Sequence, residues 1–333
     1  MKNILVTGRN LLSEPIVWTG LLTPVLFIAF MCCGAYSASL SDLLNPSPML
    51  IAVLKLRALR LLCAFVVGGS LAVAGAACQA ALRNPLAEPY ILGVSGGASV
   101  GAATAIILGL AIVSEFFIPI FSLLGAIVAL TLVLTISKRW AADTPASIAL
   151  AGVVIGSMCS SLLMFMISVS NSHELNDIIW WLLGCLQPAG PVLLSIAAGS
   201  LLLATILFTL LGREVDAITF GEETAFSLGI NPGKLSLILL GAASLLTACS
   251  VAVSGIIGFV GLITPHIVRN LFGSQHRRLF PLCMLFGGIF LMGCDTFARS
   301  IFAARELPVG VITSFIGGPF FLWILSRRRA WEG

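Results

Sequence analysis

The chain is built as a series of long apolar runs separated by short polar turns. The runs cover residues 16–36, 58–82, 92–113, 116–137, 146–169, 190–211, 235–265, 280–298 and 308–326. Turn signals such as Asn84-Pro85 and Asp143-Thr144-Pro145 separate them. Because about 20 apolar residues are enough for a helix to cross the hydrocarbon core of a bilayer, the pattern predicts an all-α, multi-pass membrane protein.

The run 235–265 decides the number of spans. It holds no charged residue over 31 positions, which is too long for one untilted helix across a core of about 30 Å, and Ser254-Gly255 offers a break. With ten spans and both termini in the cytoplasm, 13 of the 18 Lys and Arg residues lie on the cytoplasmic side, whereas nine spans leave nine on each side. Since positive charges concentrate inside, we predict ten spans with cytoplasmic N and C termini.

Composition excludes several classes of protein. Of the 333 residues 59% are hydrophobic and only 10% charged, whereas soluble domains average about 25% charged residues. A soluble enzyme is therefore excluded, and residues 1–333 are predicted to form one transmembrane domain, so that any ATPase or catalytic domain belongs to another polypeptide. The net charge of +4, with no basic run longer than residues 327–329, provides no nucleic-acid surface.

Few residues in the runs could hold a metal or move a proton. The nine cysteines form no C-x-x-C motif and nearly all lie in apolar runs, which suggests neither disulfides nor a zinc site. His173, His266 and His276 are too scattered for a metal cage. Asp295 precedes Arg299 by four residues on one helix face, so we expect an ion pair in preference to a proton relay.

Two stretches have a composition with a functional interpretation. Residues 68–102 are rich in glycine, which favours close helix packing and also suits an adaptable lining of a path through the bilayer; both can hold. In the polar stretch 213–234, a short helix is predicted from Glu222 to Leu228, with Gly229 as its stop and Asn231-Pro232 starting the next helix. This helix is interpreted as a cytoplasmic docking surface, and the alternative is a solvated connector.

Five motifs, taken in order along the chain, resemble the FecCD-type permeases, the membrane subunits of type II ABC importers for iron-siderophores, haem and vitamin B12. The resemblance covers about residues 16 to 329. The motifs are Arg57-Ala-Leu-Arg60, Asn84-Pro-Leu-Ala-Glu88-Pro with Ile91-Leu-Gly-Val-Ser-Gly-Gly97, Gly221-Glu-Glu-Thr-Ala-Phe-Ser-Leu-Gly229, Gly258-Phe-Val-Gly-Leu-Ile-Thr-Pro-His266 and Glu306-Leu-Pro-Val-Gly310.

The resemblance implies partners and sites. It implies a homodimer or a heterodimer with a related permease, two ATPase subunits below and a periplasmic substrate-binding protein above. Arg57, Arg60 and Arg299 match positions that dock the binding protein, and Asn84 with Leu86 matches the inner gate. The second gate region, residues 144–147, matches less well because it contains a proline. The residues expected to couple to the ATPase are Glu222, Glu223, Ala225, Leu228 and Gly229.

The resemblance thus implies a non-enzymatic permease subunit in the inner (cytoplasmic) membrane of a bacterium, with an iron-siderophore-type chelate as the expected cargo. The chain itself is expected to bind no cofactor, because ATP and magnesium belong to the partner ATPase. Haem and cobalamin are the alternative cargoes within the family. An ion-coupled secondary transporter is the alternative class, although the chain lacks the midplane carboxylates that coupling ions require.

Overall fold

The computed structural model describes residues 15–33, 47–140, 145–186, 190–301 and 306–329, and these ranges are helical with short connections and no strand. The helices are α1 (Pro15–Cys32), α3 (Pro48–Ala81), the 3-10 turn η2 (Pro89–Leu92), α4 (Val94–Ile107), α5 (Leu110–Val113), α6 (Phe117–Trp140), α7 (Pro145–Val169), α8 (Ser172–Leu182), α9 (Pro191–Leu210), α10 (Gly212–Thr219), α11 (Glu222–Ser227), α12 (Pro232–Ser254), α13 (Val260–Phe272), α14 (His276–Ser300) and α15 (Val309–Arg329).

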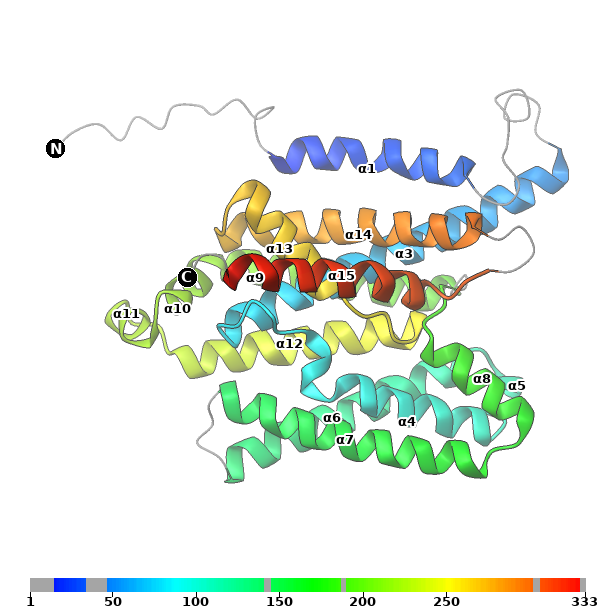
Figure 1. Cartoon of the computed structure of the whole chain (residues 1–333), viewed down its shortest axis with the longest axis horizontal. Helices are drawn as coiled ribbons and strands as arrows, with labels where there is room; N and C mark the ends of the chain where they lie inside the picture. Colours follow the sequence, from blue (N-terminus) through cyan, green and yellow to red (C-terminus); the bar gives the residue numbers. More distant parts are fainter. Residues whose placement is uncertain (1–14, 34–46, 141–144, 187–189, 302–305, 330–333) are drawn as a thin grey trace.

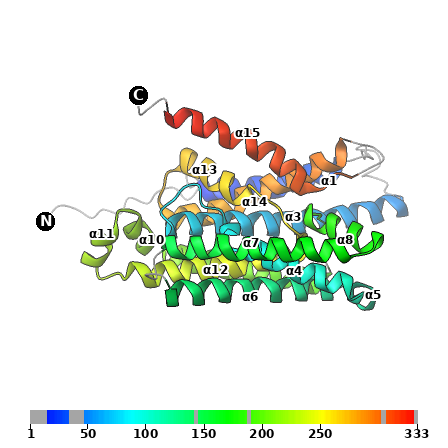
Figure 2. The same ribbon diagram turned by 60° about the horizontal axis from the view of Figure 1, so that its bottom comes forward.

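The long helices run side by side in one bundle (Figures 1 and 2). The short helices α10 and α11 lie at one end of it, called here the α11 end, and α5 and α8 lie at the opposite end, called the α8 end. The described chain starts with α1 and finishes with α15 at the α11 end. The all-α, multi-pass prediction is therefore confirmed.

Helix length separates clear spans from shorter ones. In the described ranges seven helices are long and apolar enough to cross a membrane, namely α1, α3, α6, α7, α9, α12 and α14. The remaining three of the ten predicted spans correspond to α4, α13 and α15, which do not meet the same length and hydropathy requirements. The predicted break in the run 235–265 is present, because α12 ends at Ser254 and α13 begins at Val260. The total of ten crossings stays a prediction.

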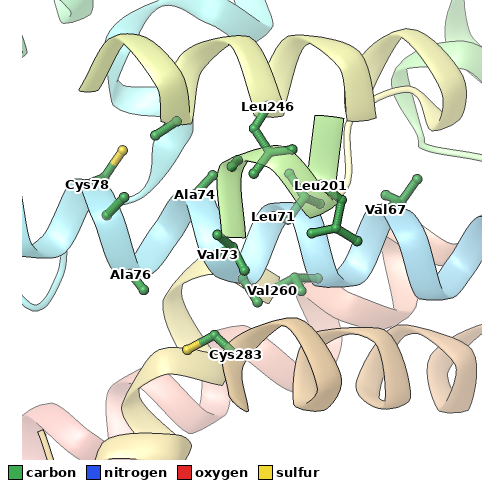
Figure 3. Close-up of a cluster of buried hydrophobic side chains, with 14 of the residues drawn as sticks. Val67, Leu71, Val73, Ala74, Ala76, Cys78, Leu201, Leu246, Val260 and Cys283 are labelled. Atoms are coloured by element: carbon green, nitrogen blue, oxygen red, sulfur yellow. The ribbon is translucent and has the colours of Figure 1, made fainter. Parts of the chain in front are cut away.

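The helix α3 forms the core of the bundle. Nearly all of its apolar stretch is buried, and it packs against α14, α12, α13 and α9. Figure 3 shows apolar side chains of these helices meeting around α3. Helices at the periphery instead expose large apolar side chains such as Leu203 of α9 and Phe165 of α7, which are 71% and 61% exposed. An apolar exterior of this kind suits a lipid solvent.

Glycines set how closely the central helices approach. A Cβ added to Gly68 of α3 would clash with the backbone of Gly287 of α14, and one added to Gly75 of α3 would clash with the backbone of Gly261 of α13. Neither position has room for a side chain, so backbone packs directly on backbone. The close-packing interpretation of the small residues is confirmed here, and the interpretation as a path lining stays a prediction.

The contact between Gly75 and Gly261 is open to a direct stability test. We expect Gly75→Ala to destabilise the protein by about 1–3 kcal/mol, because the added methyl group forces α3 and α13 apart. Thermal unfolding of the detergent-solubilised protein measures this effect.

The matched control is Gly241→Ala in α12, where an added Cβ meets nothing within 4 Å. That variant should unfold at the wild-type temperature or above it, since alanine is the better helix former. Equal melting temperatures for the two variants would contradict the packing argument.

Candidate functional site

A stretch of non-helical backbone lies within the bundle between α12 and α13. Gly255 ends α12 in a left-handed conformation (φ 68°) and residues 256–259 are not helical. The 13 residues of α13 rise about 20 Å at about 1.5 Å per residue, which is shorter than a bilayer core of about 30 Å. In a crossing formed by α13, the non-helical residues 255–259 would therefore supply the remaining length.

Two side chains from the loop after α3 form hydrogen bonds with backbone groups of this non-helical segment. The Tyr90 hydroxyl donates to the Ile257 carbonyl oxygen at 3.0 Å and accepts from the Ile257 N–H at 3.2 Å. The Glu88 carboxylate accepts from the N–H of Phe259 at 2.8 Å, where the chain takes a left-handed turn (φ 68°) into α13. Without water, each of these backbone groups needs a protein partner. Sequence reasoning missed these roles of Glu88 and Tyr90.

The predicted inner gate belongs to the same loop. The Asn84 side-chain oxygen accepts from the N–H of Leu86 at 3.0 Å, which fixes a tight turn directly after α3. Asn84 is exposed and Leu86 is half-buried. Their gate role stays a prediction. In the second gate region, Thr144 lies outside the described residues, Pro145 starts α7, and the hydroxyls of Ser147 and Ser137 are 2.8 Å apart.

The hydrogen bond from Phe259 to Glu88 predicts a local exchange effect. Glu88→Ala should leave the Phe259 N–H without its acceptor, a loss of about 1–3 kcal/mol. Hydrogen exchange of a peptide covering residues 255–262 should therefore become faster. Glu88→Gln keeps an acceptor oxygen and should exchange nearly as slowly as the wild type. Unchanged exchange in Glu88→Ala would show that Glu88 does not support this turn.

The α11 end carries the segment predicted to couple to the ATPase. The helix α11 begins at Glu222, as predicted, and ends at Ser227, one residue earlier than predicted. Gly229 has φ 77° and Asn231 caps α12 by accepting from the Lys234 N–H at 3.0 Å, so the predicted stop and cap are confirmed.

The coupling residues differ in exposure. Glu223 is exposed, and Leu228 is 64% exposed beside Phe226 at 60%. Ala225 is fully buried, and its carbonyl oxygen accepts from the N–H groups of Leu228 and Ile230. Ala225 therefore shapes the turn, while Phe226 and Leu228 present an apolar surface that sequence reasoning named only in part.

Sequence reasoning also missed α10 and its link to α14. The Asp216 carboxylate accepts from the backbone N–H of His276 at 3.0 Å and lies 2.7 Å from the His276 Nδ1. The backbone at Gly212 approaches that of Arg277 so closely that an added Cβ would clash. Two contacts therefore fix α10 to the first residues of α14.

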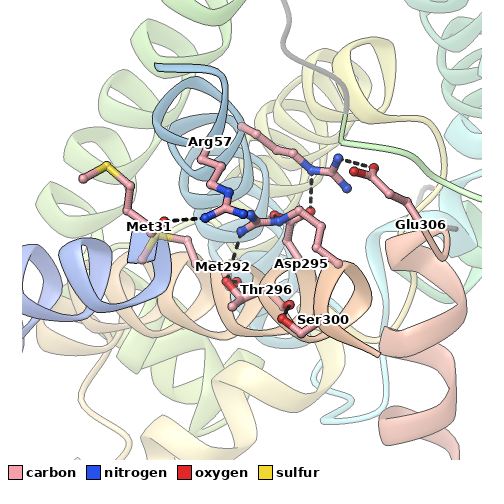
Figure 4. Close-up of polar contacts among 9 residues, drawn as sticks. Met31, Arg57, Met292, Asp295, Thr296, Ser300 and Glu306 are labelled. Atoms are coloured by element: carbon pink, nitrogen blue, oxygen red, sulfur yellow. Dashed lines mark hydrogen bonds and ion pairs between the residues drawn. The ribbon is translucent and has the colours of Figure 1, made fainter. Parts of the chain in front are cut away.

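The predicted docking arginines lie close together, because Arg60 of α3 and Arg299 of α14 both bind Asp295, and Figure 4 shows Arg57 beside this carboxylate. The start of α3 and the end of α14 lie at the α8 end (Figure 1). The Arg60 Nε donates to Asp295 at 2.8 Å and its Nη1 donates to Glu306 at 2.5 Å. The Arg299 Nε donates to the other oxygen of Asp295 at 2.9 Å, which gives the ion pair expected from the i, i+4 spacing. Arg57 donates to the Met31 carbonyl oxygen at 3.3 Å. The spacing of these residues in the sequence did not predict the contacts of Arg60 with Asp295 and Glu306.

Exposure within this cluster is uneven. The side chains of Arg60 and Arg299 are 14% and 6% exposed and that of Asp295 is fully buried, whereas Glu306 is 63% exposed. Two of the three predicted docking arginines are thus already held by carboxylates of this chain. Binding-protein docking stays a prediction.

A groove of about 670 Å³ borders the cluster, with Arg60, Glu306 and Trp180 in its lining.

The histidines form no metal cage in the part of the chain that the structure describes, where no group of three His, Cys, Asp or Glu could hold an ion. His266 packs edge-on against Phe320 and His276 binds Asp216.

The fold and these two ends define a multi-pass membrane protein. At one end the short helices α10 and α11 form a platform, and at the other Arg57, Arg60 and Arg299 form an arginine cluster. The model of the FecCD transport family matches residues 21–327, and the chain belongs to that family. It is 36% identical to the hemin transport system permease protein HmuU of Yersinia pestis, over 93% of this chain and 94% of that protein.

Two further comparisons agree. The vitamin B12 import system permease protein BtuC of Shigella boydii is 34% identical over 98% of this chain and all of its own length. A solved metal-chelate type ABC transporter in an inward-facing conformation superposes with a TM-score of 0.82 and 29% identity, covering 93% of this chain and 98% of that one. The chain is thus an ABC importer permease, a transport subunit that works with an ATPase and other permease subunits.

Proposed function

We propose that this permease carries an iron-siderophore-type chelate across the inner membrane of a bacterium, with haem and cobalamin as the alternative cargoes. The single observation that carries the mechanism is the course of α14. It is fixed to α10 by Asp216 at one end and holds Asp295 and Arg299 in the arginine cluster at the other. One helix thus joins the proposed ATPase platform to the proposed docking surface.

Charge orients the protein in this proposal. The basic residues in the helix ends that lie at the α11 end are Arg83 just after α3, Lys138 and Arg139 of α6, Arg213 of α10, Lys234 of α12, Arg269 of α13, Arg277 and Arg278 of α14, and Arg327 to Arg329 of α15. Those near the α8 end are Lys55, Arg57, Arg60 and Arg299. Since positive charges concentrate inside, the α11 end faces the cytoplasm and the α8 end faces the periplasm.

The proposed assembly has two permeases, identical or related, and two ATPase subunits that bind ATP and magnesium. Phe226 and Leu228, both exposed, insert into a cleft of the ATPase, and α10 passes the movement to α14. A periplasmic binding protein docks at the α8 end with acidic side chains. Asn84 and Leu86 close the inner side of the path. In this proposal ATP and magnesium bind to the partner ATPase and not to this chain.

The first test is ATP-driven uptake. Proteoliposomes that contain the permease and its ATPase, with the cognate binding protein outside and ATP inside, should accumulate the ferric chelate. Accumulation should continue after a protonophore collapses the proton gradient, because ATP drives this transport and no proton relay is needed. Asp295, the carboxylate within the bundle, is held between Arg60 and Arg299 in ion pairs. Haem and cobalamin are supplied in parallel. Loss of uptake on adding the protonophore would favour a secondary transporter.

A variant at the platform serves as the mechanistic control for that assay. Gly229→Val should lower both ATPase association and uptake while membrane insertion stays normal, because a β-branched residue at φ 77° is strained. Gly233→Val is the matched variant, since Gly233 is also exposed but lies in the first turn of α12. Wild-type uptake by Gly229→Val would contradict the coupling role.

The second test concerns the docking surface. Arg57→Gln should weaken binding of the binding protein roughly tenfold or more, since hydrogen bonds to charged groups contribute about 1.5–3 kcal/mol. Glu306→Gln should strengthen binding, because the exposed Glu306 carboxylate occupies Arg60 and competes with an incoming acidic side chain. Surface plasmon resonance at low and high salt measures both effects.

Lys55→Gln is the control at the same end, because Lys55 is exposed and lies on α3 two residues before Arg57. It should change the on-rate slightly and leave the dissociation rate unchanged. If Arg57→Gln binds with wild-type affinity and salt dependence, the arginines anchor lipid headgroups and do not dock a protein.

A further inference from the structure

A cavity of about 480 Å³ opens at the α11 end between α3, α10, α13 and the start of α14. We call it the inner cavity. The lining residues that matter here are Gln79, Arg83, Asp216, Phe220, Arg269 and His276. It lies apart from the apolar surface of α11, and neither the gate nor the docking surface accounts for its chemistry.

The central feature of the inner cavity is the guanidinium group of Arg269. Its Nη2 donates to the side-chain oxygen of Gln79, a neutral amide. The Gln79 amide nitrogen in turn donates to the Gly261 carbonyl oxygen at 3.1 Å, which fixes the orientation of the amide. Within the described ranges, no carboxylate lies at ion-pair distance from Arg269. The half-buried cation thus has a hydrogen-bond partner but no counter-charge.

The acidic residue of the lining does not fill this role. Asp216 accepts from the His276 backbone N–H and lies against the His276 ring through the same carboxylate oxygen. Taking a guanidinium group out of water without a counter-charge is unfavourable, and an anion that reaches it gains charge-assisted hydrogen bonds. The four remaining N–H donors of Arg269 therefore suit an oxyanion, and Arg83 adds positive charge to the same lining.

The position of the inner cavity indicates the source of that oxyanion. Basic pockets between transmembrane helices on the cytoplasmic side accept anionic lipid headgroups, and the inner cavity lies between such helices at the proposed cytoplasmic end. Phe220 at its edge is 79% exposed, which provides apolar surface beside the basic lining. We infer that the inner cavity binds the phosphate of an anionic phospholipid headgroup through Arg269 and Arg83.

The test is native mass spectrometry of the permease purified in mild detergent from membranes that contain phosphatidylglycerol and cardiolipin. The wild type should retain bound anionic phospholipid. Arg269→Gln should raise the lipid dissociation constant roughly tenfold or more, as loss of a charge-assisted hydrogen bond predicts. Arg139→Gln, which removes an exposed arginine at the same end but outside the inner cavity, should retain lipid as the wild type does.

Gln79→Glu separates lipid binding from a structural role of Arg269. It supplies an internal carboxylate at the atom that already accepts from Arg269, so the new ion pair offsets the lost donation to Gly261. The lipid should be released while the melting temperature stays near that of the wild type. If both Arg269→Gln and Gln79→Glu retain lipid, the inference is wrong.

Two further measurements distinguish the other occupants. Inorganic phosphate added to delipidated protein should raise the melting temperature less than phosphatidylglycerol does; an equal rise would show a site for free phosphate and overturn the lipid assignment. Assembly with the ATPase should leave the retained lipid in place. Release of lipid on assembly would show that an acidic side chain of the ATPase is the natural partner of Arg269, and would also overturn the assignment.

Discussion

The structure depends on one constraint, which is that backbone groups inside a bilayer must find hydrogen-bond partners within the protein. Continuous helices meet it without help, but the chain leaves helical geometry between Gly255 and Val260. Glu88 and Tyr90 supply the missing partners there. The loop after α3 is therefore a structural support for α13 as well as the location of the predicted gate, so movement of this loop would also disturb α13.

A related constraint, that a buried charge needs a partner, explains the arrangement of charge at the α8 end. Asp295 is fully buried and accepts from Arg60 on α3 and Arg299 on α14, so each oxygen of the carboxylate has its own arginine partner. Removing one member of such a set leaves a buried charge uncompensated, which is more costly than never having formed the pair. The cluster thus joins α3 to α14 and at the same time keeps the guanidinium groups together at the α8 end.

Features that depend on near neighbours in the chain were predictable from the sequence, and contacts between distant segments were not. The apolar runs, the break after Ser254, the stop at Gly229 and the cap at Asn231 depend on residues a few positions apart. So does the pair of Asp295 with Arg299. The contacts of Arg60 with Asp295, of Asp216 with His276 and of Glu88 with Phe259 join segments 60 to 235 positions apart. Residue spacing carries no information about them.

The close packing of α3 on α14 bears on how the two ends can communicate. At Gly68 and Gly287 the backbones touch, so α14 cannot slide past α3 without one helix clashing with the other. Arg60 and Asp295 hold the same two helices together again near the α8 end. A displacement that α10 applies to His276 is therefore expected to move α14 together with α3 as one body. In that case the two helices keep their shape and move as a unit against their surroundings.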